Sequence, residues 1–433
     1  MKLRFLSLTI AASAAAFAGS VSSAPTYYKD IVPVLQNRCQ ECHRPGEVAP
    51  MSLMSYNDVR PWSKAIKSAI LTKKMPPWFA DPHIGKFSND RSMSQSEIDT
   101  FVSWVDAGSP AGNPKDAPKP RTFAEGWQIG KPDVVFELPQ PIDVPATGVV
   151  DYTYVVIPTG FTEDKWVQFA EARPGARSAM HHIIAFLRPP GNHWLQDAKP
   201  GVPFIPGKSG PARRGGNPED QLPGELLVGF APGLPPTQCK PGEAKLVKAG
   251  SDIILQLHYT PNGKATTDVS KIGLIFAKGP VERRVMTMNA MNVFLRIPPG
   301  DSNYEARSHA TLPQDVTLVN MMPHMHLRGK DFLYTAVYPT GEKQVLLSVP
   351  HFDFNWQLAY VEDKELLLPK GTRIECVAHY DNSPNNPANP DPSKEVRWGD
   401  QTWEEMMIGW FDVSFDAKAD PALLRQRQRE RSE

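Results

Sequence analysis

The chain has 433 residues, and its 47 lysines and arginines are balanced by 47 aspartates and glutamates. Because the formal net charge is zero, the composition gives no support for a nucleic acid or an anionic membrane surface as the partner. The length exceeds what one core usually holds, and 44 prolines with 30 glycines favour short strands joined by turns.

Residues 1–24 have the pattern of a secretion signal. Lys2 and Arg4 precede a short apolar run, and small residues follow it, with Ala18 and Ala24 as candidate cleavage positions. The run is shorter than the roughly 20 apolar residues that cross a bilayer. We therefore expect a periplasmic or secreted protein without a membrane span.

Residues 25–112 are predicted to form a small all-α domain, and residues 113–131, rich in Pro, Gly, Ala and charge, are predicted to be a linker. Ser94 and Glu97 have the spacing of a capping box at the start of the last helix of this domain. The apolar face of that helix is predicted to consist of Ile98, Phe101, Val102 and Val105.

The sequence Cys39-Gln40-Glu41-Cys42-His43 is typical of a c-type haem attachment site. Two thiols one helical turn apart can each form a thioether with a vinyl group of the haem, and the adjacent imidazole can reach the iron. A thioredoxin-like pair needs a preceding strand, and a zinc site needs a second ligand pair nearby. Because the sequence offers neither, we expect one covalently attached haem c.

The sixth ligand of this haem is predicted to be Met75. It lies in Lys74-Met75-Pro76-Pro77-Trp78, which resembles the Met-Pro-Pro segment that supplies the axial thioether in many class I cytochromes c. Residues 28–112 as a whole resemble such a cytochrome, and a Met/His ligand pair raises the reduction potential of a haem. The rival ligands are His83, Met51 and Met54.

Two all-β sandwich domains of jelly-roll type are expected at residues 132–285 and 286–420, before a charged tail at residues 421–433. Residues 189–241 are a long loop rich in Pro and Gly. The predicted strands are Asp133–Glu137, Tyr152–Ile157, Trp166–Phe169, Ile183–Leu187, Ile253–Tyr259, Lys271–Ala277, Val293–Ile297, Val316–Met321, Phe332–Tyr338, Gln344–Val349, Thr372–His379 and Met407–Val413.

Five of the 11 histidines lie in three strand-like segments. His324 and His326 are two residues apart, so a strand places both on one face, where they can share a metal ion. His181 and His182 are adjacent, so they can share an ion only where a twist, a bulge or a strand end redirects one of them. His258 is the fifth histidine of this set.

A fourth segment, Glu404-Glu405-Met406-Met407, adds thioethers. Imidazole suits copper and zinc alike, whereas a thioether shifts the preference toward Cu(I). We therefore expect copper at these positions.

These four segments resemble the copper type II, ascorbate-dependent monooxygenases, the family of peptidylglycine α-hydroxylating monooxygenase and dopamine β-monooxygenase. The resemblance runs from about residue 132 to residue 417 and implies one copper ion on each of two β-sandwich domains. For the first copper it implies the ligands His181, His182 and His258. For the second it implies His324, His326 and Met406.

The chain departs from this family in its cysteines and around the second copper. Only Cys239 and Cys376 lie outside the haem motif, and they can pair, stay reduced or be buried. Met407 stands where the animal enzymes have a cysteine, and it is the alternative to Met406 as the ligand, since a shift of one residue reverses the face of a strand.

A second group of departures concerns the substrate. The animal peptide enzyme has an Arg just before its His-x-His pair that grips the substrate carboxylate, whereas this chain has Met321, Met322 and Pro323 there. Trp410 stands where that enzyme places a substrate-facing Tyr. These differences favour a small, apolar substrate over a peptidylglycine.

The resemblance implies hydroxylation of a substrate C–H bond by dioxygen at the copper of His324, His326 and Met406. The other copper is expected to store or relay one of the two electrons. These electrons come through the fused haem, from a periplasmic donor or ascorbate. Two alternatives stay open: a non-enzymatic electron-transfer or copper-handling protein, and a copper oxidoreductase that passes substrate electrons to the haem.

The remaining polar residues of interest fall into two groups. Structural or surface roles are expected for His193, His309, His351 and His379. Orientation of the metal ligands through hydrogen bonds is expected of Asp400, Gln401, Glu404 and Glu405.

Overall fold

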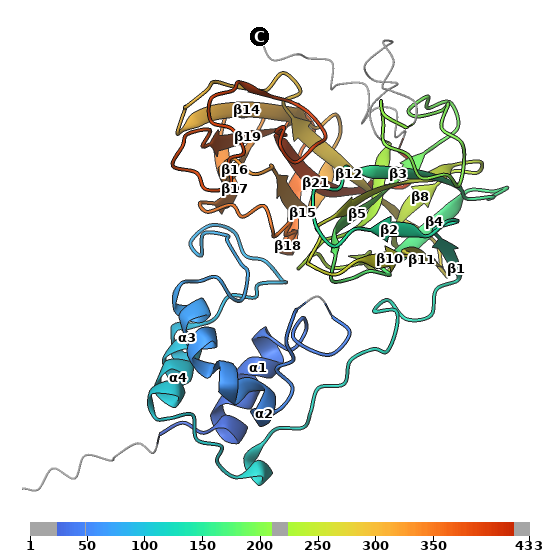
Figure 1. Ribbon diagram of the computed structural model, residues 1–433. Coiled ribbons are helices and arrows are strands. Elements are labelled where there is room, and N and C mark those ends of the chain that lie inside the picture. The colour runs from blue at the N-terminus through green and yellow to red at the C-terminus, as the bar shows by residue number, and fades with distance from the viewer. Residues whose placement is uncertain (1–23, 48, 210–223, 420–433) are drawn as a thin grey trace, which may run out of the picture.

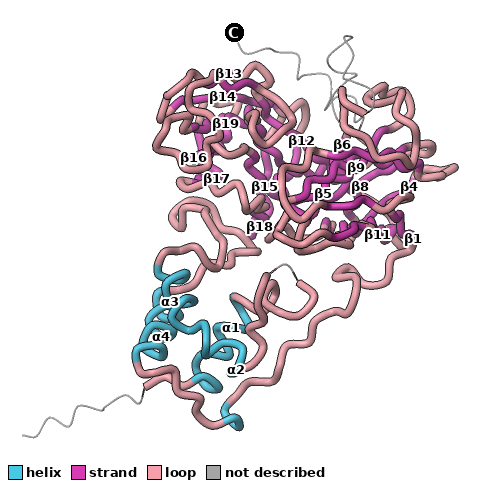
Figure 2. Tube along the Cα trace, in the orientation of Figure 1, coloured by secondary structure: helices cyan, strands magenta, loops and turns pink. Residues whose placement is uncertain are grey.

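The computed structural model describes residues 24–47, 49–209 and 224–419 (Figure 1). The predicted signal, apart from Ala24, and the predicted tail at residues 421–433 lie outside the described residues. The chain is mostly β-sheet with few helices, and the helices gather at one end, whereas the strands form the rest (Figure 2). Among the described residues, no helix is both long and apolar enough to cross a membrane.

The helical part is held by a small aromatic and aliphatic core. Phe101 and Trp104 of the last long helix are fully buried, and the ring of Tyr27 lies 6.1 Å from the Trp104 ring. The predicted capping box is confirmed: the Ser94 hydroxyl accepts from the Glu97 amide, and the Ser94 amide donates to the Glu97 carboxylate. The elements are η1 Tyr27–Ile31, α1 Val32–Arg38, α2 Tyr56–Val59, η2 Arg60–Trp62, α3 Ser63–Leu71, α4 Gln95–Asp106 and η3 Pro114–Asp116.

The first sandwich packs two antiparallel sheets around one core, in which Val155, Leu255 and Ile272 are fully or almost fully buried. One sheet has the order β3 (Thr153–Pro158), β9 (Asp252–Tyr259), β5 (Met180–Arg188), β6 (Glu225–Phe230). The other has the order β1 (Val134–Glu137), β11 (Lys271–Phe276), β4 (Lys165–Arg173), β8 (Glu243–Val247). The short pairs at its margins are β2 (Ile142–Val144) with β10 (Thr266–Asp268), and β7 (Thr237–Gln238) with β4.

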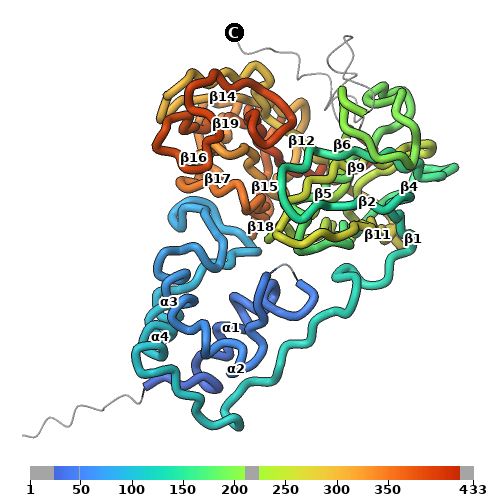
Figure 3. Tube along the Cα trace, in the orientation of Figure 1, coloured from blue at the N-terminus to red at the C-terminus, as the bar shows by residue number. Residues whose placement is uncertain are grey.

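The second sandwich repeats this plan and buries Phe332, Tyr334 and Phe411 in its core. One of its sheets runs β12 (Arg283–Met291), β21 (Ile408–Asp416), β15 (Val316–His324), β18 (Tyr360–Leu368). The other runs β14 (Tyr304–Thr311), β19 (Arg373–Tyr380), β16 (Gly329–Val337), β17 (Lys343–Val349). A small pair, β13 (Arg296–Ile297) with β20 (Val396–Arg397), completes it, and Figure 3 traces the chain through both sandwiches.

The two sandwiches share one continuous sheet, because β8 pairs in parallel with β12. Lys245 on β8 has no exposed side-chain surface, and its ammonium donates to the Leu226 carbonyl and to the Thr287 hydroxyl at 2.8 Å each. Arg284 on β12 pairs with Glu225 on β6 at 2.8 Å. The predicted boundary between residues 285 and 286 falls inside β12.

The helical part also lies against the second sandwich. The rings of Trp78 and Phe87 pack on the Tyr360 ring of β18, at 4.9 and 5.5 Å between centroids. The Ser88 amide donates to the Val361 carbonyl at 2.9 Å. Apolar packing and backbone hydrogen bonds therefore fix residues 78–90 to β18.

Most of the predicted strands are confirmed within a few residues, but one predicted strand and one predicted loop are wrong. The loop expected at residues 189–241 contains β6 and β7. In the predicted strand Val293–Ile297, residues 293–294 form a turn, and only Arg296–Ile297 pairs as β13. The Asn292 side chain accepts a hydrogen bond from the Phe294 amide, and this local bond replaces a ladder bond. The strands that the sequence analysis missed are β2, β6, β7, β8, β10, β12, β14, β18 and β20.

Candidate metal and haem sites

Three of the predicted histidines meet on neighbouring strands of the first sandwich. His182 on β5 stands directly opposite His258 on β9. The ladder between these strands shifts register between Met180 and His182, so His181 is the extra residue of a β-bulge. Because a bulge turns its extra side chain away from the regular alternation, His181 and His182 can point to the same place although they are adjacent.

The geometry of these three imidazoles fits a metal ion. The Nδ1 atom of His181 lies 3.3 Å from Nδ1 of His182 and 3.2 Å from Nδ1 of His258. One ligand nitrogen of each residue lies within 4.8 Å of the other two. Tetrahedral bonds of 2.0 Å would separate ligand nitrogens by about 3.3 Å, so the two measured nitrogen pairs have the spacing of ligands on one ion.

Neighbouring side chains orient this cluster. His182 Nε2 donates to the Gln256 side-chain oxygen at 3.1 Å, which leaves the Nδ1 lone pair of His182 free to bind an ion. The Tyr152 ring lies 4.3 Å from the His258 ring, and the Thr402 hydroxyl from the second sandwich lies 3.4 Å from His258 Nε2. The first cluster is therefore completed by residues of both sandwiches.

Burial keeps these imidazoles neutral. Desolvation, and then the nearby His324, lower the pKa of His181 to about 4. Desolvation, followed by His181 and His326, lowers the pKa of His258 to about 2. The pKa of His182 is also lowered well below its usual value, mainly by burial. A neutral imidazole has a lone pair available at neutral pH, as a metal ligand requires.

The second predicted cluster lies at the end of β15. The rings of His324 and His326 stand 5.2 Å apart and perpendicular, whereas Met325 between them is buried in the core. His324 Nδ1 donates to the Gln357 side-chain oxygen at 2.9 Å, and the Gln357 amide donates to the Phe354 carbonyl, also at 2.9 Å. These two bonds fix the orientation of the amide and leave His324 Nε2 available.

His326 is the more deeply buried member of this pair. Its Nδ1 donates to the Glu404 carbonyl at 3.2 Å, and its Nε2 is buried without a hydrogen-bond partner. Desolvation, and then His324, lower its pKa to about 3. A buried nitrogen with a free lone pair is costly unless it binds something, so His326 Nε2 suits a metal ion.

Met406 and Met407 differ in their packing. Met407 has no exposed surface and belongs to the core of the second sandwich, whereas Met406 belongs to none of the described core clusters. The carboxylate of Glu405, next to Met406, accepts from the backbone amides of His326 at 2.9 Å and Arg328 at 2.7 Å. Glu405 therefore ties the methionine segment to the turn that carries His326.

Phe354 lies between the two histidine clusters. Its ring stacks on His181 at 4.7 Å and 19°, and its edge meets the His326 ring at 6.0 Å. The two imidazoles are thus no further apart than the sum of these distances. The loop of residues 353–359 reaches both clusters, because it also carries Gln357.

The face of β15 beside His324 is apolar. Met322 and Trp410 stand opposite each other on β15 and β21 and pack against the outer face of the first sandwich. Met321, which the sequence analysis grouped with Met322, instead lies in the core of the second sandwich. Side-chain alternation along the strand explains this difference.

The Cys39–His43 segment follows α1. His43 Nδ1 donates to the Met51 carbonyl at 3.2 Å, which leaves Nε2 available for an iron. Desolvation, and then the neighbouring Cys42, raise the pKa of Cys39 to about 12. A redox-active dithiol needs a lowered thiol pKa, so these cysteines do not have the environment of a thioredoxin-like pair.

Met75 is half-buried, and its role as the sixth ligand stays a prediction. Its rival His83 is exposed and bonds to Asp81 at 3.0 Å, and Met54 is also exposed.

The residue pair Cys239 and Cys376 forms no disulfide, and both thiols are buried.

Sequence reasoning missed Phe354, Gln357 and Gln256. Gln256 had a detectable signal, because it lies two residues before His258 and so shares its face of β9. Phe354 and Gln357 lie in an irregular loop about thirty residues after His324, and no spacing rule connects such residues to a site. Glu405 was expected to orient ligands, and it bonds to the backbone of His326.

Comparison with known proteins places the chain in no family. No protein-family model matches it, and no curated protein matches it. Among solved structures, it is similar to the major capsid protein P2 of bacteriophage PM2, with 10% identity and a TM-score of 0.24 over 66% of this chain and 100% of that one. The VP2 subviral particle of infectious bursal disease virus gives 9% identity and a TM-score of 0.19 over 68% and 75%. Likenesses this weak support no conclusion about function.

Proposed function

We propose that this chain is a copper-dependent monooxygenase that hydroxylates a C–H bond of a small, apolar substrate, with electrons supplied through a fused c-type haem domain. The observation that carries the proposal is the convergence of His181, His182 and His258 at the spacing of metal ligands, made possible by a β-bulge. Gln256 holds the His182 ring through Nε2, so that its Nδ1 is directed toward His181.

The second cluster supports copper and not zinc. If Met406 joins His324 and His326 as the third ligand, its thioether would make a soft, electron-rich site, which favours Cu(I). Glu405 fixes the backbone of His326 against the methionine segment, and Gln357 fixes the ring of His324. These bonds would hold the ligands of an ion in place without using Nε2 of His324 or of His326.

The residues at the Cys39–His43 segment fit a haem in the same way. The Cys39 and Cys42 thiols are free and half-buried directly after α1, and His43 presents Nε2 because Nδ1 is already bonded. When bound, the coppers would supply dioxygen chemistry and the haem would supply single electrons, whereas the protein supplies position and environment.

The surroundings of His324 support an apolar substrate. Met322 and Trp410 form an apolar wall on the same face of the sheet, and the Phe354 ring restricts the space between the clusters. A substrate with a charged group would leave that group unpaired beside this wall, which costs free energy.

The test uses the full chain loaded with copper and haem, ascorbate as reductant, ¹⁸O-labelled dioxygen and a panel of alkylbenzenes. We expect a hydroxylated product that carries one labelled oxygen atom, with the other atom released as water after uptake of two electrons and two protons. Met406→Ala is expected to abolish this product while the haem spectrum stays unchanged. Full turnover by Met406→Ala would refute the assignment.

The same preparation separates the two alternatives. Anaerobic reduction of the haem by one of the alkylbenzenes would show that electrons run from substrate to haem. Copper and haem binding without any oxygen-dependent product would leave an electron-transfer or copper-handling protein.

A further inference from the structure

An ion pair joins the haem-binding segment to the first copper sandwich. Glu47 lies four residues after His43, and Arg177 lies four residues before His181. The Arg177 guanidinium is 3.0 Å from the Glu47 carboxylate, and these side chains are only 15% and 12% exposed. The contact therefore connects the neighbourhood of one predicted redox centre directly to the neighbourhood of another.

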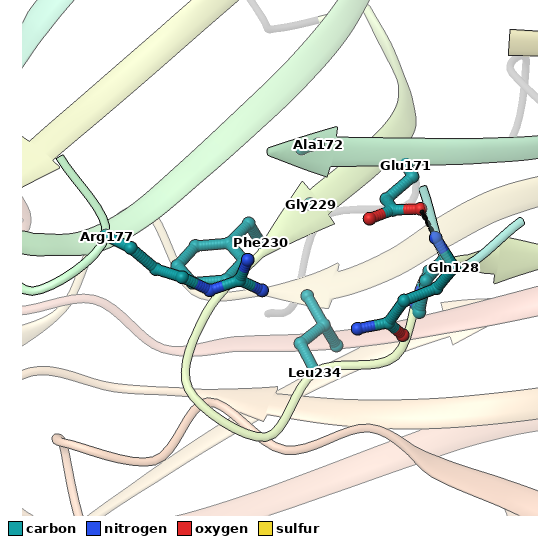
Figure 4. Close-up of a pocket in the computed structure, with 8 residues that line it drawn as sticks. Gln128, Glu171, Ala172, Arg177, Gly229, Phe230 and Leu234 are labelled. Carbon is teal, nitrogen blue, oxygen red and sulfur yellow. Dashed lines mark hydrogen bonds between the residues drawn. The ribbon is translucent and has the colours of Figure 1, made fainter. Parts of the chain in front are cut away.

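The first sandwich provides a built environment for Arg177. Its guanidinium lies 5.4 Å from the centroid of the Phe230 ring, and it borders a small, partly open pocket of about 30 Å³ that Glu171 and Gln128 also line (Figure 4). The Arg177 Nε atom is buried without a hydrogen-bond partner. Such a side chain is held by the aromatic ring and by its charge partner, so the ion pair with Glu47 helps to fix the guanidinium.

The haem-binding segment is held from the other side as well. Glu47 also pairs with Arg44 at 3.1 Å, and the Arg44 guanidinium lies 4.3 Å above the ring of Phe123 in the linker. The Glu47 carboxylate therefore holds one cation of the haem-binding segment, Arg44, and one cation of the first sandwich, Arg177.

Other contacts hold the helical part independently of this ion pair. The backbone hydrogen bonds of Ser88 with Val361 and of Asp363 with Lys86 lie on β18 of the second sandwich. Loss of the Glu47–Arg177 pair would therefore free only the haem-binding segment, while these hydrogen bonds keep the helical part attached to β18. A variant without the ion pair can thus be compared with the wild type in a folded chain.

We propose that the Glu47–Arg177 ion pair positions the haem against the strand that carries His181 and His182, which makes the three-histidine site the first acceptor of haem electrons. The inference rests on the proposed function, because it needs both the haem and the copper. In the step itself, ferrous haem iron loses one electron and becomes ferric, and a cupric ion gains that electron and becomes cuprous. No atom is transferred.

The experiment follows oxidation of the ferrous haem by cupric ions within the anaerobic, fully loaded chain, in a stopped-flow instrument. We expect Arg177→Gln to slow this oxidation at least tenfold and, in copper-free protein, to lower the haem reduction potential, because a nearby positive charge is removed. The double variant E47R/R177E restores the pair in reverse and should recover much of the rate. Lys240→Gln, which breaks the exposed pair with Glu365, should leave the rate unchanged.

Two copper-site variants identify the acceptor. His258→Ala should abolish the fast oxidation of the haem, whereas Met406→Ala should preserve it. A wild-type rate in Arg177→Gln, or loss of the fast phase in Met406→Ala but not in His258→Ala, would overturn the inference. If the chain still makes labelled product, either of these results refutes only the role of the ion pair, and the proposed function stands. If electrons pass from haem to copper but no labelled product forms, the proposed function is refuted and the role of the ion pair stands.

Discussion

At the scale of single residues, the candidate sites depend on how adjacent side chains pack. Met325 lies in the core of the second sandwich, whereas the rings of His324 and His326 on either side of it lie 5.2 Å apart. Met407 belongs to the same core, whereas Met406 belongs to none of the described core clusters. At His181 the regular alternation of β5 is broken by a bulge, and three imidazoles meet as a result.

The difference in packing gives opposite expectations for the two adjacent methionines. Met407→Ala removes a fully buried side chain and should lower the free energy of unfolding by about 2–5 kcal/mol, while copper binding persists at low temperature. Met406→Leu should keep a wild-type melting temperature and lose Cu(I) from the second site. Calorimetry together with Cu(I) titration tests both, and the reverse pattern would make Met407 the ligand.

At the scale of elements, two loops provide contacts to the histidines that the strands themselves do not provide. Residues 353–359 carry Phe354, which stacks on His181, and Gln357, which bonds to His324. Residues 401–406 carry Thr402, which approaches His258, and Glu405, which bonds to the His326 amide. Both loops belong to the second sandwich and reach both clusters.

The loop of residues 353–359 can be tested through its hydrogen bond to the second cluster. Gln357→Leu removes the acceptor for His324 Nδ1–H, and loss of such an orienting partner typically weakens metal binding about 10–100-fold. Copper affinity at the second site should fall by this factor, while the first site is unaffected. Asn355→Ala, an exposed change in the same loop, is the control; equal effects of both variants would argue for general loop disruption instead.

A pH dependence belongs to β18, on which the helical part is attached. Burial, and then the neighbouring Asp363, raise the pKa of Glu362 from 4.5 to about 7. The folded state therefore binds this proton more tightly than the unfolded state, and stability should decrease as the pH rises from about 4.5 to 7. Glu362→Gln should remove this decrease in pH-dependent thermal unfolding. The exposed Glu365→Gln should leave it intact, and a pH profile unchanged by Glu362→Gln would contradict the shifted pKa.

At the scale of the whole molecule, the sequence was sufficient for the β-rich class and for the strands with strong apolar alternation. It was insufficient for β18. The segment Tyr360–Leu368 contains Glu, Asp, Lys and Leu, a composition that suits a helix or a solvent-exposed segment. In the structure it pairs with β15, and the Trp78 ring packs on its first residue, Tyr360. The requirement for a bulge or strand end at the His181–His182 pair could be stated from spacing alone. The partners Phe354 and Gln357 could not, because only the tertiary fold brings their loop to the histidines.

The whole-molecule arrangement also explains why both histidine clusters can act together. The shared sheet through β8 and β12, with the buried Lys245 and the Arg284–Glu225 ion pair, fixes one sandwich against the other. The Phe354 ring then contacts His181 of the first sandwich and His326 of the second, at 4.7 and 6.0 Å between ring centroids.

The central claim is that scattered imidazoles and one thioether assemble two copper centres beside a covalently bound haem. The direct measurement is elemental analysis of the purified full chain together with a pyridine haemochrome spectrum, for the wild type and for His258→Ala. We predict two coppers and one haem c per wild-type chain, and one copper with one haem c for His258→Ala. Bound zinc in place of copper, or a copper content that His258→Ala leaves unchanged, would contradict the account.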